Sequence, residues 1–205
     1  MNKFLSQQID RLSLRQLHKR KSMVSHFKAP NMPPLKSGEF CSYFNTLIGV
    51  SLGGFLTNLT STVESDIDIL ISVFYANSLA TSIWDTIPGK YIKNDFIQNS
   101  FSYDQLINHW AVITPSLYQP AVTKNRILLL SAAYDQYINL EDSNELWAKW
   151  GKPRRNIYNC GHSGIVLLRN KIRKDSLEFI NSKLQAGGLH MLVLFFALWI
   201  IAGNS

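Results

Sequence analysis

The sequence has few cysteines for its length, and this scarcity limits the classes of protein to which it can belong. Cys41 and Cys160 are the two cysteines in 205 residues. Two cysteines cannot form the disulfide framework of a small secreted domain, so we expect a reducing compartment, the cytoplasm. The sequence also has no group of residues with metal-ligand spacing and no glycine-rich phosphate loop. We therefore expect neither a metal nor a cofactor.

We also expect neither a signal peptide nor a nucleic-acid recognition motif. The first apolar segment is interrupted by polar residues over 7–11, and this is not the pattern of a secretory signal. The net charge is +7, but the basic residues are spread along the chain apart from 18–21 and 169–174. No recognition motif accompanies either group, so we expect no nucleic-acid partner.

The chain is long enough for one domain with a sizeable core, and its apolar runs alternate with helical patterns. Leu146, Trp147 and Trp150 have helical spacing and predict a helix over 141–150, and a further helix is expected to begin near Ile165. The apolar runs predict strands over 44–48, 66–73, 126–131 and 155–159. This alternation indicates an α/β protein with a mostly parallel sheet flanked by helices.

A serine between two glycines follows the first of these strands. Ser51 is the central residue of Gly49-Val50-Ser51-Leu52-Gly53, and the residues after it open a helix. A strained turn from strand to helix, with the serine hydroxyl pointing outward, has this pattern. Glycine is needed at 49 and 53 because a side chain there would collide with the neighbouring strand or helix. An ordinary glycine turn is the alternative interpretation.

An aspartate and a histidine follow in the chain, each after a strand. Asp135 comes at the carboxyl end of the strand over 126–131, where open α/β sheets bind ligands. His162 lies between Gly161 and Gly164 in the loop after the last strand. Taken alone, the aspartate could be a turn former or helix cap, and the histidine a surface or packing residue. Serine, aspartate and histidine in this order, each at a strand end, form the pattern of a catalytic triad.

With these residues the chain resembles the α/β-hydrolase superfamily, in particular its uncharacterised, mostly bacterial branch of abhydrolase-domain proteins. The resemblance covers about residues 45–184, roughly the C-terminal half of such a domain. It rests on Gly49–Gly54, Ser82–Asp85, His109–Pro115, Ala133–Asp135, Leu146–Pro153 and Gly161–His162.

The resemblance also implies roles for individual residues. Ser51 would be the nucleophile, His162 the general base and acid, and Asp135 the residue that orients the imidazole. The backbone N–H of Leu52 would be one oxyanion donor. The implied activity is hydrolysis of an ester or related acyl compound, so the expected partner is a small-molecule acyl substrate.

The resemblance does not extend to the N-terminal part of that domain. The strands and helices that precede the serine in the family do not fit into 48 residues, and residues 1–44 instead predict an amphipathic helix over 4–24 followed by a proline-rich linker. Nothing resembles the loop that normally supplies a second oxyanion donor. We therefore expect a truncated α/β-hydrolase fold with an exposed edge beside the serine strand, where self-association can occur. The alternative function is a catalytically incompetent fragment that serves as an interaction or membrane-peripheral protein.

The predicted core over 45–184 contains an insertion and is followed by a tail. Residues 76–124 are an aromatic-rich insertion, which we expect to be a helical lid over the serine or a set of helices packed on the sheet. Residues 185–205 are an apolar tail. Within its stretch over 189–202, the twelve apolar residues over 191–202 would span about 18 Å as a helix, less than the ~30 Å of a bilayer core. It is therefore predicted to be a helix docked on the domain, an interfacial membrane anchor, or a segment sheltered by self-association.

Overall fold

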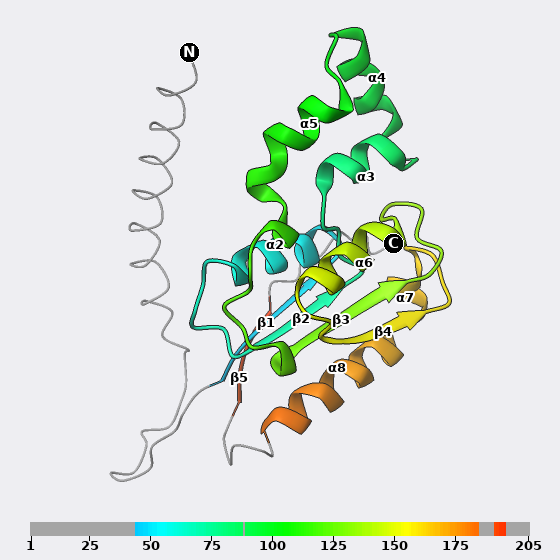
Figure 1. The fold of residues 1–205 in the computed structure, drawn as a ribbon. Helices are drawn as coiled ribbons and strands as arrows, with labels where there is room; N and C mark the ends of the chain where they lie inside the picture. Colours follow the sequence, from blue (N-terminus) through cyan, green and yellow to red (C-terminus); the bar gives the residue numbers. More distant parts are fainter. Residues whose placement is uncertain (1–43, 88, 185–190, 196–205) are drawn as a thin grey trace. The chain divides into compact units, whose positions relative to one another are not determined.

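The strands of the described chain form one parallel sheet. The computed structural model describes residues 44–87, 89–184 and 191–195, so the amphipathic helix predicted over 4–24 and the proline-rich linker lie outside the described residues. The strands lie in the order β4-β3-β2-β1-β5, all parallel (Figure 1). They are β1 (Phe44–Val50), β2 (Ile69–Val73), β3 (Ile127–Ala132), β4 (Arg154–Tyr158) and β5 (Met191–Phe195). The predicted α/β class is confirmed.

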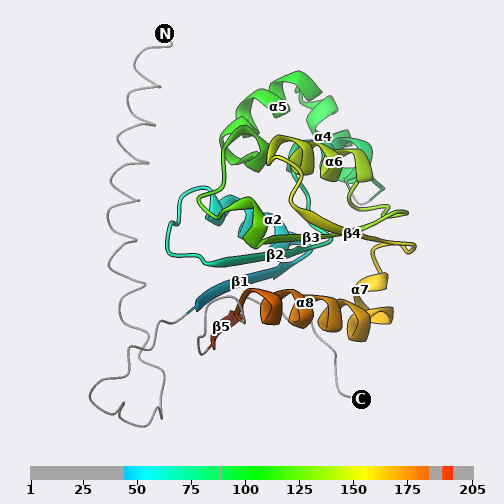
Figure 2. The ribbon, with the colours of Figure 1, turned by 60° about the horizontal axis from the view of Figure 1, so that its bottom comes forward.

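The two central strands, β2 and β3, are buried along their whole length. Helices cover both faces of the sheet, as a parallel sheet requires. On one face lie α2 (Leu52–Ser61) and α6 (Leu140–Lys149), and on the other α7 (Gly164–Leu167) and α8 (Arg169–Leu184) (Figures 1 and 2). The apolar residues of the strands alternate between the two resulting cores, which explains why their sequences read as continuous apolar runs.

The second strand begins later than predicted, at Ile69 instead of residue 66. Asp68, a polar residue just before this strand, makes hydrogen bonds and an ion pair to residues at the start of other strands. The N–H of Asp68 donates to the carbonyl of Asn45 at 2.9 Å, and the Asp68 carboxylate accepts the N–H of Asn45 at 3.0 Å and pairs with Arg126 at 3.0 Å. The carboxylate thereby ties together the beginnings of β1, β2 and β3.

The C-terminal apolar run contains a strand, and the prediction of a helix is wrong over Met191–Phe195. This segment pairs with β1, from Phe44 opposite Met191 to Ile48 opposite Phe195. A short apolar run fits a buried helix or a buried strand equally well by its period. The backbone of β1 needs partners along its outer edge, and β5 supplies them. The prediction of an exposed edge beside the serine strand is therefore also wrong. The other residues of the predicted run, 189–190 and 196–202, lie outside the described chain.

The insertion over 76–124 is helical, as predicted. Helix α3 packs against both α4 and α5, on the same side of the sheet as α2 and α6 (Figures 1 and 2). Its elements are α3 (Leu79–Asp85), α4 (Lys90–Gln98), α5 (Tyr103–Trp110), and the 3₁₀ helices η2 (Ala111–Ile113), η3 (Pro115–Leu117) and η4 (Lys124–Arg126). None of the helices in the described ranges is long and apolar enough to cross a membrane.

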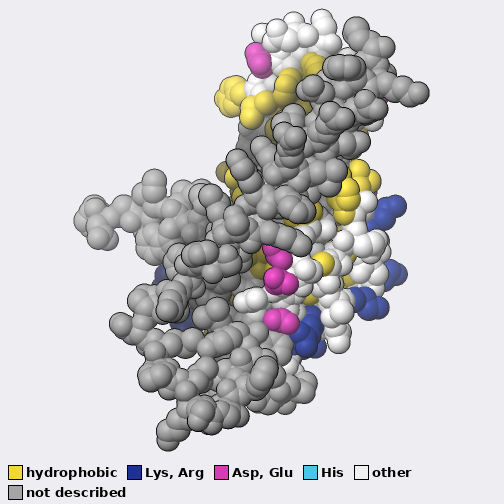
Figure 3. Space-filling model, turned by 90° about the vertical axis from the view of Figure 1, so that its left-hand side faces the viewer, with side chains coloured by type: hydrophobic (Ala, Val, Ile, Leu, Met, Phe, Trp, Pro, Cys, Tyr) yellow, Lys and Arg dark blue, Asp and Glu magenta, His cyan; other side chains and the backbone are white. Residues whose placement is uncertain are grey.

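The distribution of Lys and Arg side chains on the surface is relevant to the prediction that the protein binds no nucleic acid. On the face drawn in Figure 3, the Lys and Arg side chains of the described residues lie in separate small groups, and no continuous basic patch is visible among them. Hydrophobic side chains are visible on the same face, over the helical insertion. The absence of a nucleic-acid partner stays a prediction.

Candidate active site

Ser51 occupies a strained turn between β1 and α2. Its backbone angles are φ 55° and ψ −121°, a region that residues with a side chain rarely adopt. Such a conformation costs about 1–3 kcal/mol and persists only where the surroundings enforce it. Here the N–H of Ser51 donates to the carbonyl of Val73 on β2 at 2.8 Å, and its carbonyl accepts the N–H of Phe55 at 3.1 Å. The neighbouring strand and the first turn of α2 together hold the serine in place.

Gly49 permits a close approach between the end of β1 and helix α2. A Cβ at this position would collide with the carbonyl oxygen of Gly53 and with the hydroxyl of Thr57. One of these atoms belongs to the backbone, which cannot move aside without shifting the helix. The reason given from sequence, a collision with the helix, therefore applies at Gly49. Gly53 is itself buried in the first turn of α2.

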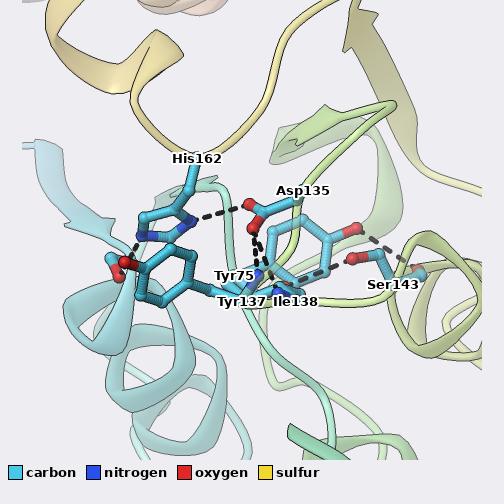
Figure 4. A network of polar contacts seen from close by, with 7 residues as sticks. Tyr75, Asp135, Tyr137, Ile138, Ser143 and His162 are labelled. Atoms are coloured by element: carbon cyan, nitrogen blue, oxygen red, sulfur yellow. Dashed lines mark hydrogen bonds and ion pairs between the residues drawn. The ribbon is translucent and has the colours of Figure 1, made fainter. Parts of the chain in front are cut away.

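His162 bridges the serine and the aspartate, which lie 84 residues apart in the chain. Its Nε2 lies 2.9 Å from the Ser51 hydroxyl oxygen, and its Nδ1 lies 2.7 Å from Oδ2 of Asp135. Figure 4 shows the imidazole and the carboxylate side by side. The three residues follow β1, β3 and β4, and the carboxyl ends of parallel strands meet at one edge of the sheet. The structure thus brings together the three side chains that the sequence singled out.

Asp135 makes the contacts that both interpretations of the sequence require, those of a turn former and those of a partner of His162. Its Oδ1 accepts the backbone N–H groups of Tyr137 at 2.8 Å and Ile138 at 3.1 Å, a turn-forming arrangement, while Oδ2 faces His162. The side chain of Asp135 is 2% exposed and that of His162 is 18% exposed. The backbone of its own turn therefore holds the carboxylate in position, independently of the imidazole. Because the carboxylate is buried, few water molecules can hydrogen-bond to it.

Two aromatic residues beside His162 were not identified from the sequence. The Tyr137 ring stacks on the imidazole, with ring centroids 4.9 Å apart and planes at 28°. The Phe74 ring approaches it at 6.3 Å and 54°. Tyr137 is two residues from Asp135 in the chain, so the sequence alone could have predicted that it lies near the candidate site. Phe74 follows β2, and only the order of the strands shows that it reaches the histidine.

Cys160 lies two residues before His162, beside the candidate site. Burial raises the pKa of its thiol, and the charge of Asp135 adds to this. A raised pKa disfavours the thiolate, which is the nucleophilic form of cysteine.

Leu52 is the first residue of α2 and is 53% exposed. The first N–H groups of a helix have no partner inside it and carry partial positive charge. The N–H of Leu52 can therefore donate to an anion beside Ser51. Within the ranges that the structure describes, no group of three metal-ligating side chains could hold a metal ion.

A buried carboxylate on α6 attaches the start of the insertion to that helix. Asp142 accepts the N–H of Asn77 at 2.6 Å and that of Ser78 at 2.9 Å, where the insertion begins. The Asn77 side-chain oxygen accepts the N–H of Ser116, near the insertion's other end, at 3.0 Å. Burial raises the pKa of Asp142 to about 6, against the lowering effect of the two N–H groups, and the charge of Glu145 raises it further. One carboxylate thus holds the base of the insertion.

Comparison with known proteins places the chain among relatives. A curated relative is 53% identical over 115 residues, which are 56% of this chain and 99% of the relative. That relative is the uncharacterized protein YdjC of Bacillus subtilis (strain 168). The chain belongs to the same family as YdjC. No family model matches the chain.

Solved structures give the fold. An acylaminoacyl peptidase of Pyrococcus horikoshii matches 65% of this chain with a TM-score of 0.50 and 19% identity. An acylaminoacyl peptidase in complex with Z-Gly-Gly-Phe-chloromethyl ketone matches 68% with a TM-score of 0.51 and 18% identity. The chain spans 22% and 23% of the length of these two proteins. The similarity establishes an α/β-hydrolase fold, of which this chain has a part.

Proposed function

We propose that this protein is a serine hydrolase that acts on an ester or a related small acyl compound. The observation that carries the proposal is the pair of hydrogen bonds through His162, to Ser51 at 2.9 Å and to Asp135 at 2.7 Å. A serine hydroxyl is a weak nucleophile unless a base next to it can take its proton. The strained turn at Ser51, in a fold of the α/β-hydrolase type, supports the same conclusion.

The distances indicate how the proton would move. With its Nδ1–H donating to Asp135, the neutral imidazole has a free lone pair on Nε2 that faces the Ser51 hydroxyl. Oγ of Ser51 attacks the acyl carbon while its proton passes to Nε2. The buried charge of Asp135 then stabilises the imidazolium, and the N–H of Leu52 donates to the oxyanion.

The same groups would serve in the remaining steps, which are loss of the alcohol and hydrolysis of the acyl-enzyme. The imidazolium gives its proton to the leaving alcohol oxygen as the acyl carbon–oxygen bond breaks, which leaves an acyl group on Ser51. Water then attacks the acyl carbon, and His162 takes a proton from it. The acid leaves when the bond to Ser51 breaks and the serine oxygen recovers a proton from the imidazolium. These reaction steps balance without a metal or a redox partner.

Turnover of p-nitrophenyl esters of increasing acyl length by the purified full chain tests the proposal. We expect Ser51→Ala to reduce kcat/KM by at least about 10³-fold, because residues of such a relay act as a unit. Ser65→Ala is the matched control, since Ser65 is exposed and precedes β2, at the opposite end of the strands from Ser51. Equal background rates for the wild type and Ser51→Ala would contradict the proposal. They would favour the catalytically incompetent fragment.

A further inference from the structure

The stacked ring beside His162 has no role in the proton relay described above. Tyr137 is 52% exposed, and an exposed tyrosine side chain is ordinarily free to change its rotamer. Here its ring lies against the imidazole at 4.9 Å and 28° (Figure 4). Stacking between rings is favourable beyond the surface area that it buries. The contact therefore restrains both rings.

One carboxylate fixes the position of both rings. Oδ1 of Asp135 accepts the backbone N–H of Tyr137 at 2.8 Å, and Oδ2 lies 2.7 Å from Nδ1 of His162. Asp135 thereby contacts the edge of the imidazole directly. It also holds the turn that carries Tyr137, whose ring covers one face of the imidazole. Phe74 approaches the same imidazole and is 1% exposed, with its own N–H donating to Leu130 at 2.7 Å. The histidine is thus restrained by aromatic rings as well as by hydrogen bonds.

This restraint matters most when the bond from His162 to Ser51 is absent. Once the serine oxygen carries an acyl group, its hydroxyl proton is gone and only Asp135 still holds the imidazole by a hydrogen bond. The ring must nevertheless stay aligned to take a proton from the incoming water. We propose that Tyr137 is a positioning residue, whose stacked ring keeps the imidazole of His162 aligned and shields the Nδ1–H bond to Asp135 from water. For its effect on turnover, this inference rests on the proposed function.

Kinetics of three variants test the inference with p-nitrophenyl esters. Tyr137→Leu is expected to lower kcat about 2- to 10-fold with KM unchanged, the range expected for loss of one aromatic contact. Tyr137→Phe keeps the ring and is expected to restore the wild-type rate. Tyr134→Leu is the matched control, because Tyr134 is a 67% exposed aromatic in the same loop, and its backbone N–H bond to Cys160 survives the change. A change in KM that depends on the acyl chain would overturn the inference, since it would mark a substrate contact.

A spectroscopic measurement tests the inference without turnover. The Nδ1–H proton of His162 is expected as a far-downfield NMR resonance that disappears in His162→Gln. Its exchange with water should accelerate in Tyr137→Leu and stay slow in Tyr137→Phe and Tyr134→Leu. Unchanged exchange and unchanged kcat in Tyr137→Leu would refute the positioning role. Accelerated exchange in a protein that hydrolyses no ester would leave the positioning role standing and remove the proposed function.

Discussion

The sheet and the helical insertion differ in how much of each is buried. Every residue of β2 and β3 is buried. In the insertion, α3 buries only Ala80, α5 buries only Leu106, and α4, all of whose residues the structure describes, buries none. The three candidate catalytic side chains come from the ends of strands and none comes from the insertion. The site therefore depends on the well-packed region, while the poorly packed region is free to open at lower free energy.

Two buried leucines provide the sharpest test of this difference. Leu128 on β3 is 0% exposed and Leu106 on α5 is 1% exposed. We expect Leu128→Ala to lower the free energy of global unfolding by about 2–5 kcal/mol, because it leaves a cavity in the central sheet. Leu106→Ala should mainly accelerate hydrogen exchange over 79–110 and leave the strands protected. Urea unfolding and hydrogen-exchange mass spectrometry measure the two effects.

The comparison fails if the two regions unfold as one unit. In that case both substitutions would lower the urea midpoint by similar amounts, and exchange would accelerate across β2 and β3 in either variant. Wild-type exchange over α3–α5 that is as slow as exchange in β2 would contradict the comparison even before any substitution.

A smaller effect is expected where the insertion is bound to α6 through Asp142. The pKa of Asp142 is about 6 in the folded protein, against 3.8 for an unperturbed aspartate. The folded state therefore binds the proton more tightly than the unfolded state, and Asp142 contributes most stability below pH ~4. We expect this contribution to fall by about 2–3 kcal/mol as the pH rises to ~6, and then to stay constant. Urea unfolding of the wild type and of Asp142→Asn at pH 4, 5, 6 and 7 gives the difference directly.

The sign of the difference decides the outcome. The stability of the wild type relative to Asp142→Asn should fall between pH 4 and 6. A relative stability that rises with pH would mean that the two backbone N–H groups outweigh the burial of the carboxylate.

The sequence predicted the regions in which local pattern and packing agree. Four strands were predicted within three residues of their observed starts. The signal was clearest for β2 and β3, which are buried along their whole length. Ser51, Asp135 and His162 were identified because each lies within four residues of the end of a strand. The structure then brought them within hydrogen-bonding distance at the edge where parallel strands end.

Contacts between distant segments escaped prediction. Met191–Phe195 has an apolar pattern that fits helix or strand, and only the free edge of β1 selects the strand. The approach of Phe74 to His162 depends on β2, β3 and β4 being neighbours in that order. Asp142 has the local signature of a residue in the first turn of a helix, and nothing in the sequence points to its partners Asn77 and Ser78.

Labelling with a fluorophosphonate tests the central claim, which is that His162 activates Ser51. We expect the native full chain to be labelled at Ser51, as mapped by peptide mass spectrometry, and His162→Gln to be labelled at least about 10²-fold more slowly. Equal labelling rates for the two proteins, or labelling of the folded wild type at a residue other than Ser51, would contradict the account.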